Sequence, residues 1–304
     1  MLRITGLKKS YKSFPVLTNL NMNIERGDVY GFVGTNGCGK TTTMNIICNI
    51  IPKDEGEIAF ENDSVTIGYL PESPALYGYM NGFEYLDFIG ACCEYEGDIK
   101  ARTSEVLSVT GMLDGAKRLI KGYSRGMNQR IGIAAALYAN PDLLILDEPT
   151  SALDPQGRAE VMDIISRLAA SGSTIILCTH ILSDVERVAN KVGILNRGVM
   201  AVEGTLPEVR KRYEGPISIF VRLRYMPEPT DPLFGIEVVE RSEIWQGGVT
   251  LFAKHGVSEA ELFYKAVTTM AENKILPEAV EFSRQSLEQI YIGVCGGSLA
   301  PMTY

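Results

Sequence analysis

The sequence contains few of the side chains that bind structural metals. Among 304 residues there are two histidines and six cysteines, and no cysteine pair has the C-x-x-C spacing that is typical of zinc sites. The cysteines are Cys38, Cys48, Cys92, Cys93, Cys178 and Cys295. We therefore expect no structural zinc site, and we interpret the cysteines as buried or semi-buried reduced thiols of a cytosolic protein.

Long apolar runs and an excess of positive charge are also absent. No apolar stretch approaches the roughly 18 residues that a membrane helix needs, and the first residues lack the apolar core of a signal peptide. We therefore expect a chain that neither spans a membrane nor is exported. The formal net charge is −8, which argues against nucleic acid as a partner, because surfaces that grip its phosphates are usually basic.

The first two thirds of the chain alternate apolar strands with helical patterns. Three segments are apolar along their whole length, which is typical of strands buried on both faces of a mostly parallel sheet: 29–33, 143–146 and 174–178. Helical spacing between 81 and 126 predicts an inserted helical subdomain. Ser183, with Glu186 three residues later, fits a capping box that opens a helix toward Ala189. Residues 192–202 predict a hairpin.

The pattern changes near residue 214 and predicts a second, small domain. A half-exposed strand, an antiparallel hairpin, a helix and a last strand and helix are expected at 217–223, 237–254, 258–272, 279–282 and from 286. Ser258 with Glu261 forms another capping box. This order predicts an open α+β sandwich that ends in a mobile tail over 296–301.

A phosphate-binding loop is the clearest motif. Residues 34–41 fit G-x-x-x-x-G-K-[ST] between a predicted strand and a helical run. They are Gly34, Thr35, Asn36, Gly37, Cys38, Gly39, Lys40 and Thr41. Glycines let backbone amides converge on an anion, and the helix points its positive end at the phosphates. We expect Lys40 to reach the β- and γ-phosphates and the Thr41 hydroxyl to bind Mg²⁺.

Two carboxylates follow the apolar strand at 143–146. Asp147 and Glu148 would be costly to bury without a use. About a hundred residues after a phosphate-binding loop, Asp147 fits the residue that associates with Mg²⁺. Glu148 comes one residue later, where its carboxylate would orient or deprotonate an attacking water.

Taken together with further motifs, these residues resemble the ABC ATPase family over about residues 2–213. Residues 123–130, Tyr-Ser-Arg-Gly-Met-Asn-Gln-Arg, resemble the LSGGQ signature and its basic helix, and 151–154 resemble the D-loop. His180 resembles the switch histidine. Tyr11 resembles the aromatic residue that stacks on adenine, and Glu72 occupies the Q-loop position.

The resemblance implies an α/β fold and a set of nucleotide contacts. The fold has a RecA-like P-loop NTPase core, a small antiparallel β subdomain and a helical subdomain at about 77–126. It spans residues 1–213 and is followed by a small α+β domain at 214–304. Lys40, Glu148 and His180 are the expected catalytic residues, and Thr41, Asp147 and Glu72 the expected Mg²⁺ contacts. ATP is expected to contact Tyr11, Val16, residues 34–42 including Thr42, Glu72, Ser124, Gly126 and Met127.

Three positions depart from the family's usual motifs. Arg125 replaces the first signature glycine and Met127 replaces the signature glutamine, whereas the phosphate-facing Ser124 and Gly126 are retained, so activity is expected to persist. Glu72 replaces the usual Q-loop glutamine. It adds a negative charge beside the γ-phosphate, which leaves the role of this loop open.

The resemblance also implies partners. Members of the family work as head-to-tail homodimers or heterodimers with ATP sandwiched between the chains, bound to a transmembrane permease subunit at the inner face of the cell membrane. A groove near residues 72–80 is the expected contact with the permease. The ending at 286–291 and the small second domain resemble the ABC-2 exporter type.

Two other functions were considered for this sequence. A soluble ABC ATPase acting on ribosomes or DNA usually carries two cassettes or long coiled coils, and neither is present here. A regulatory module that only binds nucleotide would not need the intact Lys40, Asp147, Glu148 and His180. ATP turnover measured with and without a membrane partner separates these alternatives.

Overall fold

The structure, a computed structural model, describes residues 1–213, 215–228, 230–245, 247–282 and 286–296. The chain forms two compact units, Met1–Val209 and Arg210–Tyr304, while the sequence placed the domain boundary after residue 213. Beyond Gly296, the tail expected at 296–301 lies outside the described residues. None of the described helices is both long and apolar enough to cross a membrane.

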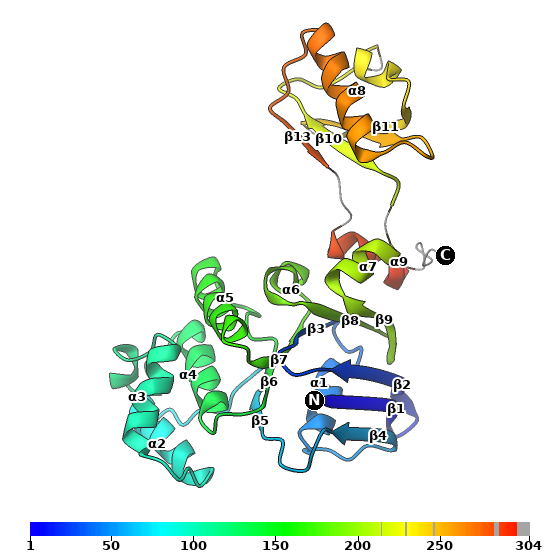
Figure 1. The fold of residues 1–304 in the computed structure, drawn as a ribbon. Coiled ribbons are helices and arrows are strands. Elements are labelled where there is room, and N and C mark those ends of the chain that lie inside the picture. Colours follow the sequence, from blue (N-terminus) through cyan, green and yellow to red (C-terminus); the bar gives the residue numbers. More distant parts are fainter. Residues whose placement is uncertain (214, 229, 246, 283–285, 297–304) are drawn as a thin grey trace. The chain divides into compact units, whose positions relative to one another are not determined.

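A nine-stranded sheet with the order β4-β1-β2-β9-β8-β3-β7-β6-β5 organises the first unit (Figure 1). Its strands are β1 (Leu2–Tyr11), β2 (Phe14–Ile24), β3 (Val29–Gly34), β4 (Glu55–Phe60), β5 (Ile67–Leu70), β6 (Leu143–Asp147), β7 (Thr174–Thr179), β8 (Lys191–Asn196) and β9 (Val199–Thr205). Strands β8, β3, β7, β6 and β5 run parallel, and β1 pairs antiparallel with β2 and β4. The α/β class with a smaller antiparallel part is confirmed.

The parallel strands are buried on both faces, as their unbroken apolar sequences predict. Tyr30 of β3 and Ile145 of β6 belong to the cluster on one face, whereas Val29 and Leu144 belong to the cluster on the other. The helices of this unit are α1 (Lys40–Ile47), α2 (Gly82–Cys92), α3 (Ile99–Val109), α4 (Arg125–Leu137), α5 (Pro155–Ala170), α6 (Leu182–Val188) and α7 (Leu206–Arg212), which runs into the second unit, with short 3₁₀ turns at Gly115–Lys117 and Ile120–Gly122.

The helical subdomain consists of α2, α3 and α4, which lie together at one end of the sheet (Figure 1). They share a core that includes Leu86, Leu107 and Ile131. The sequence placed the end of this subdomain at 126, yet α4 packs into the same core up to Tyr138. The apolar periodicity of α4 did not show whether this helix belongs to the helical subdomain or to the sheet, because one side of α4 packs on α2 and α3 and the other side on β5 and β6.

The capping box predicted at Ser183 is wrong. Helix α6 begins at Leu182 after Ile181, and no side chain caps it. Ser183 and Asp184 are instead held by Arg158, which donates to the Ser183 hydroxyl at 2.7 Å and to the Asp184 carboxylate at 2.8 Å. Arg158 lies on α5, and its charge-assisted hydrogen bond occupies the Ser183 hydroxyl that a capping box would need.

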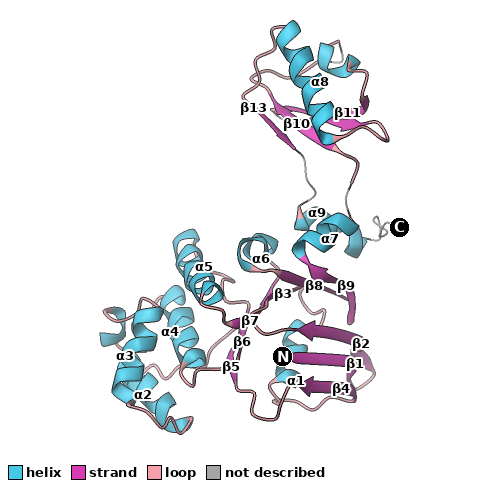
Figure 2. Cartoon of the chain, viewed as in Figure 1, coloured by secondary structure: helices cyan, strands magenta, loops and turns pink. Residues whose placement is uncertain are grey.

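The second unit contains a four-stranded antiparallel sheet with one long helix across it (Figure 2). The sheet order is β11-β12-β10-β13, with β10 (Ser218–Arg222), β11 (Val239–Trp245), β12 (Gly248–Ala253) and β13 (Ala279–Phe282). Helix α8 (Glu259–Glu272) packs its Leu262, Ala266 and Met270 on this sheet. Of the capping box predicted there, the Ser258 hydroxyl accepts from Glu261 N at 3.2 Å. A 3₁₀ turn at Pro232–Gly235 and helix α9 (Leu287–Gly296) complete the described elements.

Candidate functional site

The loop between β3 and α1 bends as its glycines allow. Gly37 and Gly39 adopt φ values of 78° and 112°, a region that side chains disfavour. A Cβ on Gly39 would lie 2.7 Å from Leu17 Cδ2, so the position also lacks room for one. Gly39 precedes the first residue of α1, and no side chain caps the helix. The amides that begin α1 therefore remain available to an anion.

Lys40 is held over this loop by its own carbonyls. Its Nζ donates to Gly34 O at 2.8 Å and to Thr35 O at 3.3 Å, and the side chain is buried. Glu148 lies 3.5 Å from the same Nζ. The ammonium is thus fixed at the mouth of the loop, where a bound phosphate would meet it.

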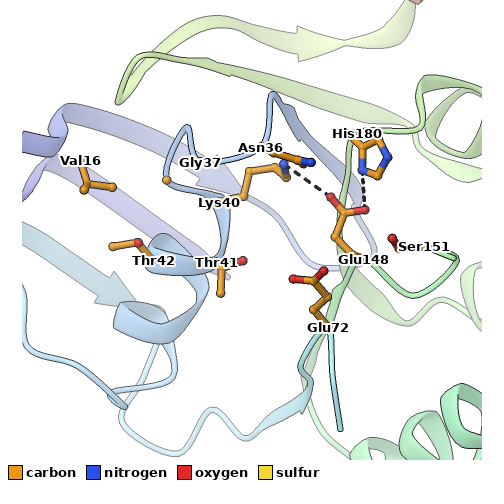
Figure 3. A pocket seen from close by; sticks show the side chains of 11 residues that line it. Val16, Asn36, Gly37, Lys40, Thr41, Thr42, Glu72, Glu148, Ser151 and His180 are labelled. Atoms are coloured by element: carbon orange, nitrogen blue, oxygen red, sulfur yellow. Dashed lines mark hydrogen bonds and ion pairs between the residues drawn. The ribbon is translucent and has the colours of Figure 1, made fainter.

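Glu148 lies between Lys40 and His180, and both side chains converge on its carboxylate (Figure 3). The distance from His180 Nδ1 to Glu148 Oε2 is 2.9 Å. Glu148 follows β6 with a φ of 50°, an uncommon backbone conformation for a side-chain-bearing residue that costs about 1 kcal/mol or more. Its amide donates to Cys178 O at 2.8 Å, which anchors the bend to β7. The strain places a carboxylate in the pocket rather than in the sheet.

Asp147 is buried directly behind Glu148, and neither of its carboxylate oxygens has a hydrogen-bond partner among the described residues. Burial raises the pKa of Asp147, and the nearby charges of Glu148 and Glu72 add to this, while Thr41 and Lys40 oppose it. A buried carboxylate without partners is costly. The unpaired oxygens and the neighbouring Thr41 hydroxyl are the oxygen donors that Mg²⁺ prefers.

The described residues contain no group of three His, Cys, Asp or Glu side chains placed to hold a metal ion by themselves. Mg²⁺ in proteins commonly takes one or two carboxylates and completes its shell with substrate phosphates and water. Asp147 and Thr41 therefore fit an ion that arrives with a nucleotide.

A pocket of about 440 Å³ lies between Lys40, Glu148 and His180. It is lined by Val16, Asn36, Gly37, Gly39, Lys40, Thr41, Thr42, Glu72, Glu148, Ser151 and His180, and the Glu72 carboxylate points into it from beyond the end of β5 (Figure 3). Of the other residues predicted for this site, Gly34, Thr35, Cys38 and Asp147 are not among its lining residues. Tyr11 also lies outside the lining and is 49% exposed.

Ser124, Gly126 and Met127 are elsewhere, in a second pocket of about 470 Å³. Ser124 caps α4 by accepting a hydrogen bond from Met127 N at 3.2 Å. Asp154 and Gly157 line the same pocket, and Asp154 caps α5. The N-termini of α4 and α5 therefore open toward one space. The two pockets have no lining residue in common.

Two groups of contacts near the pockets escaped the sequence analysis. Asp184 is buried, accepts from Thr150 Oγ1 at 2.6 Å and pairs with Arg158 at 2.8 Å, which fixes the loop after Glu148. Gln129 Nε2 donates to Glu72 O at 3.2 Å and ties α4 to the segment that carries Glu72. Gln129 was visible in the signature motif, but nothing in the sequence indicated its partner 57 residues away.

A parallel sheet, a glycine loop that opens onto a helix, a buried lysine and a carboxylate pair at the end of the neighbouring strand define a P-loop ATPase. A family model described as "ABC transporter" matches residues 17–151. The chain is 38% identical over 221 residues to the lantibiotic transport ATP-binding protein SrtF of Streptococcus pyogenes, covering 71% of this chain and 92% of that one. It is 33% identical to the linearmycin resistance ATP-binding protein LnrL of Bacillus subtilis, covering 72% and 74%.

Among solved structures, the ATP-binding cassette MJ0796, a dimer in a post-hydrolysis state with ADP and Pi, matches with a TM-score of 0.61 and 25% identity over 68% of this chain and 99% of that chain. The chain therefore belongs to the ABC transporter ATP-binding proteins. It binds ATP and is an ATPase.

Proposed function

We propose that two copies of this chain close head to tail around ATP and thereby drive a separate membrane-embedded permease that works as an exporter. The main support for dimerisation is that the two pockets are separate within one chain. The loop that would hold the triphosphate and the α4 N-terminus that would face its γ-phosphate share no lining residue. A second copy supplies the missing half of each site, as an isologous dimer requires.

Within one composite site, each side chain has a distinct task. Lys40 and the amides that begin α1 bind the phosphates. Glu148 orients the attacking water and accepts its proton, and His180 holds the Glu148 carboxylate in place at 2.9 Å. Val16 and the exposed ring of Tyr11 are the proposed contacts of adenine.

Asp147 and Thr41 would hold Mg²⁺, with Glu72 lining the neighbouring pocket. When bound, the ion neutralises charge on the phosphates. The extra carboxylate of Glu72 would strengthen the attraction for the ion but repel the γ-phosphate. Once the γ-phosphate is cleaved, the contact that bridges the two chains is lost and the dimer reopens.

The proposed contact with the permease lies over residues 72–80 and α2. Three aromatic side chains are exposed there: Tyr77, Tyr79 and Phe88. The rings of Tyr77 and Tyr79 stack at 5.8 Å, and Phe88 packs edge-on against Tyr77 at 5.6 Å. An exposed aromatic cluster of this kind favours a protein interface. Gln129 would relay closure of the ATP site to this surface through Glu72. The names of SrtF and LnrL support an exporter on the inner face of the membrane.

Mixing two inactive variants tests the pairing. Lys40→Ala should disable the phosphate loop. Gly126→Asp places a carboxylate at the α4 N-terminus, where a Cβ would meet Gly157 Cα at 3.7 Å and Ser124 Oγ at 4.0 Å, both ordinary contact distances. Neither variant alone should turn over ATP. A mixed dimer contains one site in which both halves are intact, so an equimolar mixture should regain about a quarter of the parent rate if chains pair randomly.

The matched control is a mixture of Lys40→Ala with Lys40→Ala,Gly126→Asp, which leaves no intact site and should stay inactive. Circular dichroism checks that each variant is folded. Failure of the first mixture to regain activity, with all variants folded, would show that a second copy does not complete the site.

A further inference from the structure

Five large apolar side chains are exposed at one end of the sheet in the second unit. Their exposed fractions run from 40% for Ile244 to 84% for Leu276. The set, here called the apolar tip, consists of Tyr225, Met226, Ile244, Trp245 and Leu276. None of these side chains contributes to the core beneath α8, so their exposure has no role in folding that unit.

Three segments far apart in sequence carry the apolar tip and are hydrogen-bonded to one another. Leu223 N donates to Gly247 O at 2.9 Å, which joins the end of β10 to the β11–β12 turn. Glu278 N donates to Arg222 O at 2.8 Å, which joins the end of β10 to the start of β13. The three segments therefore lie at the same end of one sheet.

The apolar tip lies at the end of the sheet that is farther from the connections to the rest of the chain. The chain enters the sheet at Ser218 and leaves it at Phe282, and these meet at one end, where Ile219 pairs with Phe282. At the other end Arg222 pairs with both Gly248 and Ala279. The tip therefore lies at the end of the sheet opposite to the pair of Ile219 with Phe282.

Charges of both signs surround the apolar tip and nearly balance, although the whole chain carries −8. Four basic and five acidic residues lie in the three segments or in contact with them: Arg222, Arg224, Arg241, Lys274, Glu228, Asp231, Glu243, Glu278 and Glu281. Ion pairs join Arg224 to Glu278 at 3.2 Å and Arg222 to Glu281 at 3.7 Å. Paired charges of this kind lower the repulsion that an acidic protein meets at an anionic surface.

We propose that the apolar tip inserts into the interfacial layer of a lipid bilayer. Tryptophan and tyrosine favour that layer, where their polar atoms stay hydrated and their rings contact acyl chains, and arginine reaches the headgroups while its stem stays apolar. A bilayer accepts single side chains without matching their shape. A stable protein interface needs roughly 20 residues on each side, many more than these five, which favours lipid over a second copy or another protein.

Trp245 is the chain's only tryptophan, so its fluorescence reports on the tip directly. The full chain is titrated with vesicles of phosphatidylcholine and with vesicles that also contain phosphatidylglycerol. We expect a blue shift of the emission with both compositions, quenching by brominated acyl chains, and little change between low and high salt, because most of the surrounding charges are paired with one another. A chain whose emission is unmoved by excess lipid would overturn the proposal.

Met226→Ser and Leu276→Ser keep the reporter and each remove one apolar tip residue. Loss of one such buried side chain should weaken vesicle binding about tenfold. Tyr264→Ser is the matched control, because Tyr264 is 68% exposed on α8, outside the tip. It should bind vesicles like the parent, and all three variants should retain ATP turnover, because their positions lie outside both pockets.

Three other outcomes would also overturn the proposal. If Tyr264→Ser weakened vesicle binding as much as the two tip variants, lipid binding would not depend specifically on the apolar tip. Binding only to anionic vesicles that salt abolishes would show an electrostatic attachment. A blue shift without lipid that follows self-association, or one that appears only with a permease in the vesicle, would show that a protein covers the tip. Each result is independent of whether the chain pairs around ATP.

Discussion

At the residue scale, Glu148 connects the two proposed functions of the site, because its carboxylate contacts both Lys40, the proposed phosphate-binding cation, and His180. Lys40 is already neutralised by Glu148 and two carbonyls before nucleotide arrives. In the proposed mechanism, a bound triphosphate would displace Glu148 from Lys40 and free the carboxylate for water, while His180 would keep its contact with Glu148 at 2.9 Å. Phosphate binding and activation of the proposed base would then be linked through this one ion pair.

Glu148→Gln should separate binding from hydrolysis. The amide keeps the shape of the side chain but cannot accept the proton, so turnover should fall by about 10² or more while ATP affinity is kept. The variant should accumulate as an ATP-bound dimer, seen as a doubled mass by light scattering. Hydrolysis at the parent rate would contradict the role assigned to Glu148.

Asp147→Asn should make the chain more stable and less active. Both Asp147 oxygens are buried without a partner among the described residues. Removing this charge should raise the free energy of unfolding by about 1 kcal/mol in buffer with EDTA, while Mg²⁺-dependent turnover is lost. Urea denaturation measures the first effect and a phosphate-release assay the second. A variant that is less stable than the parent in EDTA would show that the buried carboxylate of Asp147 is not costly. Mg²⁺-dependent turnover at the parent rate would contradict a metal-binding role for Asp147.

At the element scale, capped helix N-termini serve either stability alone or stability together with ligand binding. Helices α4 and α8 both begin after a serine whose hydroxyl accepts from the third helical amide at 3.2 Å. Ser124 lines the second pocket, whereas Ser258 does not. Ser124 and Ser258 therefore make the same capping hydrogen bond, but only Ser124 lies at the proposed ATP interface. Substituting each serine separates the loss of the cap from the loss of an ATP contact.

Ser124→Ala and Ser258→Ala should each lower the free energy of unfolding by about 1 kcal/mol through loss of the cap. Only Ser124→Ala should also lower ATP turnover, because only that hydroxyl is expected to face a γ-phosphate. Chemical denaturation and steady-state kinetics on both variants measure the two effects. Equal turnover in the two variants would leave Ser124 as a cap and nothing more.

At the scale of the whole molecule, the chain divides its apolar cores between two units. The first unit has clusters on both faces of its large sheet and one in the helical subdomain, and the second has its own cluster beneath α8. All residues that line the two pockets belong to the first unit. Ligand binding and the apolar tip are thus assigned to different units.

Calorimetry should resolve two unfolding transitions, of which ATP shifts one. Saturation at about 100 times Kd stabilises the binding unit by about 2.7 kcal/mol, which for a unit of this size raises its midpoint by a few degrees. The transition of the second unit should keep its midpoint. A single transition that moves as a whole would show that the two units unfold cooperatively.

Local chemistry made much of the fold predictable from sequence. The segments around 29–33, 143–146 and 174–178 form β3, β6 and β7, because an unbroken apolar strand is stable only when both its faces are covered. Strands β1 and β2 were not predicted. Their apolar residues alternate with polar ones but are interrupted by irregular register, which weakens the period. The capping box at Ser183 failed because Arg158 competed for the same atoms.

The sequence by itself determined the phosphate-binding loop, the carboxylates that follow β6 and the family, because glycine conformation, the end of an apolar strand and motif spacing are all properties of neighbouring residues. Only the tertiary structure decided that Lys40 and His180 meet at Glu148, that Gln129 holds the Glu72 segment and that the signature residues open into a separate pocket. It also gathered the apolar tip from three distant segments. Each of these contacts joins residues far apart along the chain, and their proximity depends on how the strands pair and the helices pack.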